Sequence, residues 1–98
     1  MAKRVHLILG TAKAKPGTNF PAHEERAFIV FALVELPQQA AQKATNYLGR
    51  TGWHDVNCKK TAVVNAEMLD GMRPEVLEAY EDAVGGKTNA IIFSDPVA

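Results

Sequence analysis

The sequence contains a single cysteine and no long hydrophobic run. Cys58 cannot form a disulfide within the chain, and an isolated cysteine is typical of a reducing compartment. The longest apolar run lies within residues 27–34, well short of the roughly 20 residues that a membrane-spanning helix needs. The apolar segment at residues 5–9 is too short for a secretory signal. We therefore expect a cytoplasmic protein without membrane contact.

The chain also lacks an excess of charge. Its formal net charge is zero, although residues 1–20 carry +4 and residues 52–98 carry −4. A sheet that binds nucleic acid presents exposed aromatic side chains among basic ones. Here Phe28 and Phe31 lie in a hydrophobic segment instead. Nucleic acid is therefore an unlikely partner.

No recognised catalytic or metal-binding motif is present. The three histidines do not form a His-Glu-x-x-His motif, and there is no cysteine pair. The segment Gly85-Gly86-Lys87-Thr88 resembles the end of a phosphate-binding loop, but it follows a predicted helix instead of preceding one. We expect neither a metal nor another cofactor, and the sequence assigns no catalytic residue.

The most regular stretch, residues 26–56, predicts a strand, a helix and a second strand. Residues 27–36 are almost continuously apolar and rich in β-branched and aromatic side chains, which is typical of a central strand covered on both faces. Pro37 suits the first position of a helix over residues 37–49, where apolar residues recur at helical spacing. A strand, a crossover helix and a strand of one sheet are expected to be parallel.

The remaining segments complete an α+β pattern. We predict strands at residues 5–12, 27–36, 54–64 and 89–93, helices at residues 37–49 and 74–84, and a connector with core-filling side chains at residues 65–72. The first two strands form a hairpin across a long loop, residues 13–25. Lys59 and Lys60 are typical of a strand at the edge of a sheet.

These elements predict one α+β domain over residues 1–98. Its architecture is ferredoxin-like: a two-layer sandwich with both helices on one face of a four-stranded mixed sheet. The other face of the strand at residues 27–36 then lacks a cover, because no polar side chain occupies alternate positions from Phe28 to Val34. We expect a second copy of the chain to cover it, through face packing or edge pairing, and therefore a homodimer.

The function favoured by these features is a small non-catalytic domain that binds another protein chain or a small ligand. The residues expected to contact a ligand are His6, Phe20, His23 and His54, and Phe20 is expected to anchor the long loop. The alternative is a small enzyme whose site lies between the loop at residues 13–25 and the sheet face that carries His6. His54 and Asp55 are predicted to point to opposite faces, because neighbours on a strand alternate.

Overall fold

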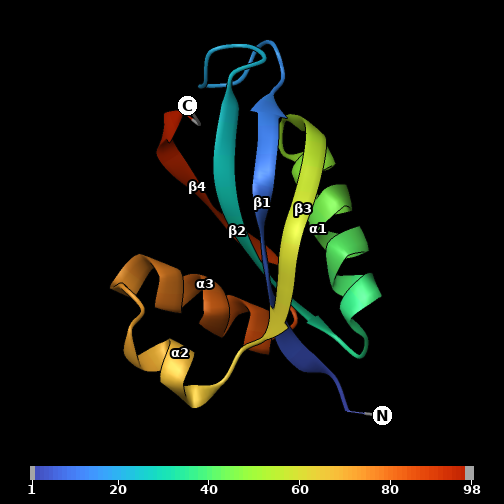
Figure 1. Ribbon diagram of the computed structural model, residues 1–98, viewed down its shortest axis with the longest axis vertical. Helices are drawn as coiled ribbons and strands as arrows, with labels where there is room; N and C mark the ends of the chain where they lie inside the picture. The colour runs from blue at the N-terminus through green and yellow to red at the C-terminus, as the bar shows by residue number, and fades with distance from the viewer. Residues whose placement is uncertain (1, 97–98) are drawn as a thin grey trace.

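The computed structural model describes the backbone of residues 2–96 and the side chains of residues 2–93. Its elements, in chain order, are β1 (Arg4–Ala14), β2 (Glu25–Val34), α1 (Pro37–Arg50), β3 (Trp53–Val63), α2 (Ala66–Asp70), α3 (Pro74–Val84) and β4 (Asn89–Pro96). The strands form one sheet in the order β3-β1-β2-β4, and every neighbouring pair is antiparallel (Figure 1). All four predicted strands and both predicted helices are present in the structure.

The long hairpin predicted at the start of the chain is confirmed. β1 and β2 pair without a register shift from Arg4 opposite Val34 to Lys13 opposite Glu25. β2 lies between β1 and β4, as expected for a strand that is apolar on both faces. Both strands extend further toward the loop than predicted, because backbone pairing continues past their apolar segments.

The predicted mixed sheet is wrong. β2 and β3 run in the same direction, but β1 lies between them and is antiparallel to both. The crossover through α1 therefore joins two strands that do not touch. The pattern of apolar residues identifies strands, but it does not say that an earlier strand inserts between two later ones.

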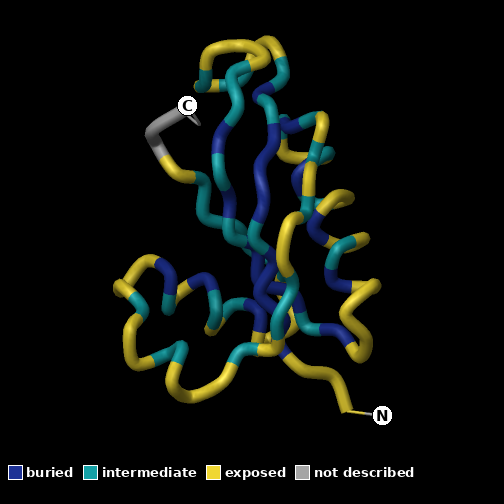
Figure 2. The backbone as a smooth tube through the Cα atoms, viewed as in Figure 1, coloured by how far each residue is buried: buried dark blue, intermediate teal, exposed yellow. Residues whose placement is uncertain are grey.

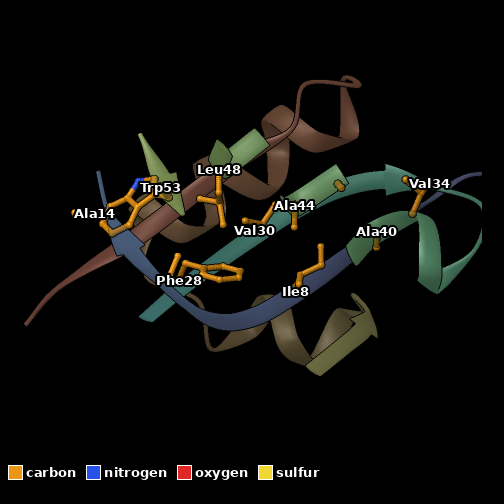
Figure 3. Packing of buried hydrophobic residues seen from close by; sticks show 11 residues of the cluster. Ile8, Ala14, Phe28, Val30, Val34, Ala40, Ala44, Leu48 and Trp53 are labelled. Atoms are coloured by element: carbon orange, nitrogen blue, oxygen red, sulfur yellow. The ribbon is translucent and has the colours of Figure 1, made fainter. Parts of the chain in front are cut away.

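The two-layer, ferredoxin-like arrangement is also wrong, because the helices lie on opposite faces of the sheet. The first core cluster joins α1 to Ile8, Phe28 and Val30, and Figure 3 shows these side chains between the helix and the strands. The second cluster joins α3 to Leu7 and Phe31. Neighbouring residues of a strand point to opposite faces, so a strand without polar alternation fills both clusters.

α3 covers only one end of its face. It crosses the sheet near the N-terminus of the chain, whereas the β1–β2 loop lies at the opposite end (Figure 1). Phe31 is completely buried beneath α3, but Leu9, Ala27 and Ile29 remain half-buried nearer the loop. Figure 2 shows the same change along β2, from buried backbone near α3 to half-buried backbone toward the loop. The second face of β2 is therefore covered in large part by α3 of the same chain. This removes the main reason for expecting a partner on this face.

The predicted connector at residues 65–72 contains a short helix, α2. Its first turn is capped by Asn65, whose side-chain oxygen accepts a hydrogen bond of 2.9 Å from the Met68 backbone N–H. Met68 and Met72 pack against the second cluster, as the sequence predicts. No helix among the described residues is long and apolar enough to cross a membrane.

Candidate functional site

The loop between β1 and β2 is fixed to the end of the sheet by backbone hydrogen bonds. The His23 N–H donates to the Ala14 carbonyl at 2.7 Å, and the Ala14 N–H donates to the Glu24 carbonyl at 3.2 Å. On the other side of β1, the Lys15 N–H donates to the Gly52 carbonyl at 2.9 Å. These bonds place residues 15–24 beside the start of β3, although the two segments are far apart in the sequence.

Phe20 anchors this loop to the α1 face of the sheet. Its ring lies 5.1 Å from the Trp53 ring, measured between centroids, and 5.0 Å from the guanidinium carbon of Arg26. Arg26 is only 7% exposed and forms an ion pair with Glu24. The prediction that Phe20 pins the loop is therefore confirmed, and its contacts are those of a structural residue.

Replacing Phe20 with alanine is expected to release the loop without unfolding the sheet. The ring is half-buried, so its loss should lower the free energy of unfolding by about 1–2 kcal/mol. Trp53 is the only tryptophan, and its emission should shift to longer wavelength as water reaches it. An unchanged emission spectrum would contradict the contact between the two rings.

His23 and His54 meet above the end of β1. His54 lies in β3 opposite Lys13 of β1, and His23 follows the loop on the other side of β1. The two side chains reach toward each other until His23 Nδ1 lies 3.0 Å from His54 Nε2, with the rings at an angle of 80°. Of the residues selected from the sequence, these two are the pair that the fold brings into direct polar contact.

Asp55 extends this pair to a chain of three side chains. Its Oδ2 lies 3.3 Å from His54 Nδ1 and 3.9 Å from Lys13 Nζ. The negative carboxylate favours the tautomer with the proton on His54 Nδ1, so His54 Nε2 is left to accept a hydrogen bond from His23 Nδ1–H. The exposed end of the chain is then His23 Nε2.

The prediction that His54 and Asp55 point apart is wrong. Asp55 has a φ of 50°, in the left-handed region, and the pairing of β1 with β3 shifts register between Thr11 and Lys13. This bulge places two residues of β3 opposite one residue of β1, which interrupts the alternation of side chains. The carboxylate thereby turns back to the imidazole that precedes it.

Backbone strain is concentrated at the same site. Among residues 2–96, the only non-glycine residues with positive φ are His23, at 64°, and Asp55. Each left-handed residue of this kind costs on the order of 1 kcal/mol, and such conformations cluster at functional sites. The surrounding hydrogen bonds hold both residues in these conformations, which fixes the approach of the two imidazoles.

His6 lies away from this cluster. It is 2% exposed on the α1 face, and its Nδ1 is 3.0 Å from the Arg4 carbonyl oxygen. Lys13 lies seven positions further along β1, about 23 Å away at about 3.3 Å per residue. A single small-molecule site cannot include both the His6 side chain and the loop, so His6 does not join the cluster of His23 and His54.

The two edges of the sheet also differ in character. β3 has two register shifts against β1 and exposes Lys59 and Lys60, which confirms the predicted edge protection. β4 has no charged residue from Asn89 to Ser94, and Phe93 is 37% exposed. One edge is therefore guarded against pairing with another strand, and the other is apolar.

No feature of the sequence could have identified the cluster as a whole. His23 and His54 are 31 residues apart, and Asp55 joins them only because of the bulge. Among the described residues there is no group of three or more His, Cys, Asp or Glu side chains that could enclose a metal ion. Comparison with protein-family models, curated proteins and solved structures gave no match.

Proposed function

We propose that this chain is a small non-catalytic binding domain of the cytosol that joins a second copy of itself through strand β4. The observation that supports the proposal most directly is the apolar edge that β4 presents, in contrast to the protected edge of β3. The single half-buried free cysteine agrees with a reducing compartment.

β4 has backbone groups available for pairing on its outer side. The Ala90 N–H donates to the side-chain oxygen of Asn89 at 2.8 Å, so it does not point toward β2. Backbone groups of alternate residues point to the same side of an antiparallel strand, and the N–H and C=O of Ile92 therefore also point outward. The Ala90 N–H is already bonded to Asn89, so an incoming strand would use the outward groups of Ile92, which no charged side chain protects.

The side chains of β4 would extend both core clusters into a partner. Ala90 and Ile92 pack against the first cluster, and Ile91 packs against the second. Exposed Phe93 lies beyond them on the strand. A strand paired to β4 would therefore continue the sheet and lie against apolar side chains on both of its faces.

A second copy suits this edge better than an unrelated strand. Two β4 strands can pair antiparallel about a two-fold axis, which is the commonest symmetry of homo-oligomers. The segment from Asn89 to Ser94 carries no charge, so two copies meet without repulsion. The resulting dimer would contain one continuous sheet, in which each copy contributes four strands and uses its β4 edge as the contact.

The test is the mass of the protein in solution, measured by light scattering across a concentration series. The wild-type protein should approach twice the chain mass of 10.7 kDa as concentration rises. Phe93→Lys introduces a charge at the proposed contact in each copy and should weaken dimerisation by about tenfold or more.

Val63→Lys is the matched control, because Val63 is 40% exposed and lies in β3 at the other edge. It should leave the dimer intact. A wild-type protein that stays monomeric at the highest concentration, or two variants that dissociate equally, would show that β4 is not the contact. Binding of a different protein by a monomeric chain would point to another occupant and would also contradict the proposal.

A further inference from the structure

We propose that His23 and His54 form a binding site for a divalent copper or nickel ion, in which Asp55 orients His54. The site lies at the start of β3, which forms the opposite edge of the sheet from β4. It therefore stands or falls independently of the proposed dimer.

The separation of the two nitrogens is short enough for both to bind one ion. Imidazole nitrogens lie about 2.0–2.1 Å from such metals, and two adjacent ligands at right angles are then about 3.0 Å apart. The distance from His23 Nδ1 to His54 Nε2 is 3.0 Å. Tetrahedral ligands would be about 3.3–3.4 Å apart at the same bond length. The same 3.0 Å is the length of the hydrogen bond between the two rings, so both lone pairs must turn toward a shared ion on binding. Copper is proposed first because it binds such sites most tightly in the usual order of metal affinities.

The carboxylate of Asp55 prepares the pair for a metal, which would replace the hydrogen bond between the two rings. Asp55 lies 3.3 Å from His54 Nδ1 and keeps the proton there, so that Nε2 presents a lone pair. A carboxylate behind a ligating imidazole is the common arrangement at metal sites, where it fixes the ring and increases its basicity. His23 must move its own proton from Nδ1 to Nε2. The side chain is exposed, so that proton then faces water.

The surroundings leave room for water to complete the coordination shell. His23 is exposed and the His54 side chain is 29% exposed. The nearby charges roughly balance, because Lys13 lies 3.9 Å from Asp55 and opposite Glu25 on β2. Arg26 is paired with Glu24. A divalent ion would therefore meet no uncompensated positive charge.

Preorganisation distinguishes this pair from two histidines that happen to share a surface. His54 belongs to a paired strand, and the His23 N–H is fixed to the Ala14 carbonyl at 2.7 Å. Both His23 and Asp55 hold left-handed backbone conformations that the fold maintains at a cost. Ligands held in place lose little further conformational freedom on binding.

The experiment is a titration of the whole protein with Cu(II), followed by the fluorescence of Trp53 and by electron paramagnetic resonance. Trp53 is the only tryptophan and immediately precedes His54, so a bound Cu(II) ion should quench its emission. We expect saturation at one ion per chain, two nitrogen ligands in the resonance spectrum and weaker binding of Ni(II), in keeping with the usual order of metal affinities.

Variants separate the ligands from their surroundings. His23→Asn and His54→Gln should each weaken binding by more than the roughly tenfold loss expected for the orienting variant Asp55→Asn. Asparagine is chosen at position 23 because it tolerates a left-handed backbone. Lys60→Gln, on the exposed side of β3 away from the site, is the control and should not weaken binding, and circular dichroism confirms that each variant is folded.

Three results would overturn the proposal. One is the absence of saturable quenching in the wild-type protein at a large excess of Cu(II). Another is a loss of binding in only one of the two histidine variants, since this would indicate a single imidazole ligand. The last is equal binding of Cu(II) by the wild-type protein and by a variant that combines His23→Asn with His54→Gln. The only histidine left in that variant is the buried His6.

Discussion

Replacing Gly10 with alanine is expected to lower the free energy of unfolding by about 3–5 kcal/mol, because the added methyl group has no space. A Cβ at this position would lie 2.0 Å from the Asn57 carbonyl oxygen and 2.9 Å from the Phe28 Cζ atom. Asn57 is on β3, next to the register shift opposite Leu9 and Gly10. The clash is therefore with backbone that moves only if β1 and β3 separate.

Chemical denaturation followed by circular dichroism measures this loss. The free energy of unfolding of small domains is about 5–15 kcal/mol. If this protein lies in the lower part of that range, the variant will be partly unfolded near room temperature. Gly49→Ala is the matched control, because Gly49 lies inside α1 and a Cβ there meets no atom within 4 Å. It should stabilise the protein by roughly 0.5–1 kcal/mol. Equal effects of the two variants would contradict the close approach of β1 and β3.

The second large effect is expected from the two phenylalanines that lie on opposite faces of β2. Phe28 is 1% exposed beneath α1, and Phe31 is 0% exposed beneath α3. Truncation of either to alanine should lower the free energy of unfolding by about 3–5 kcal/mol, from lost burial and an unfilled cavity. Phe31 also loses its edge-to-face contact with Tyr80, whose ring centroid is 6.1 Å away.

The comparison of these two variants tests how the second face is covered. Denaturation is measured at a concentration at which the protein is monomeric, so that burial by a partner does not contribute. Phe93→Ala is the control, because Phe93 is already 37% exposed and its truncation should cost well under half as much. If Phe31→Ala were as mild as Phe93→Ala, α3 would not be the element that buries this face.

The two ends of the sheet differ in how completely helices bury their faces. Near the N-terminus, helices lie on both faces, and the middle of β1 and β2 is buried on both sides there (Figure 1). Toward the loop, α1 still covers one face, but Leu9, Ala27 and Ile29 are half-buried on the other. The site of His23 and His54 lies at this less covered end, where ligands from solution can reach it.

Local chemistry in the sequence was sufficient to define most elements. The proline at position 37 begins α1, and the one at position 74 begins α3, because each occupies the first helical position. The apolar residues of β2 required burial on both faces whatever the topology. The exposed lysines of β3 marked an edge strand before its neighbours were known.

The arrangement of these elements was decided by contacts between distant segments. α3 crosses to the face opposite α1 because Val76, Ala79 and Ala83 fit over Phe31 and Leu7 there, and helical spacing is the same for either face. β1 separates β2 from β3 through backbone hydrogen bonds, which carry no side-chain signature.

The sequence by itself determined which residues must be dry and where each strand and long helix lies, because these follow from side-chain spacing and turn chemistry over a few neighbouring residues. Only the tertiary structure decided which face each helix covers and that His23, His54 and Asp55 meet. The physical reason is that this meeting depends on a bulge in β3 and on a loop fixed across β1 by hydrogen bonds, and both exist only when the strands are paired.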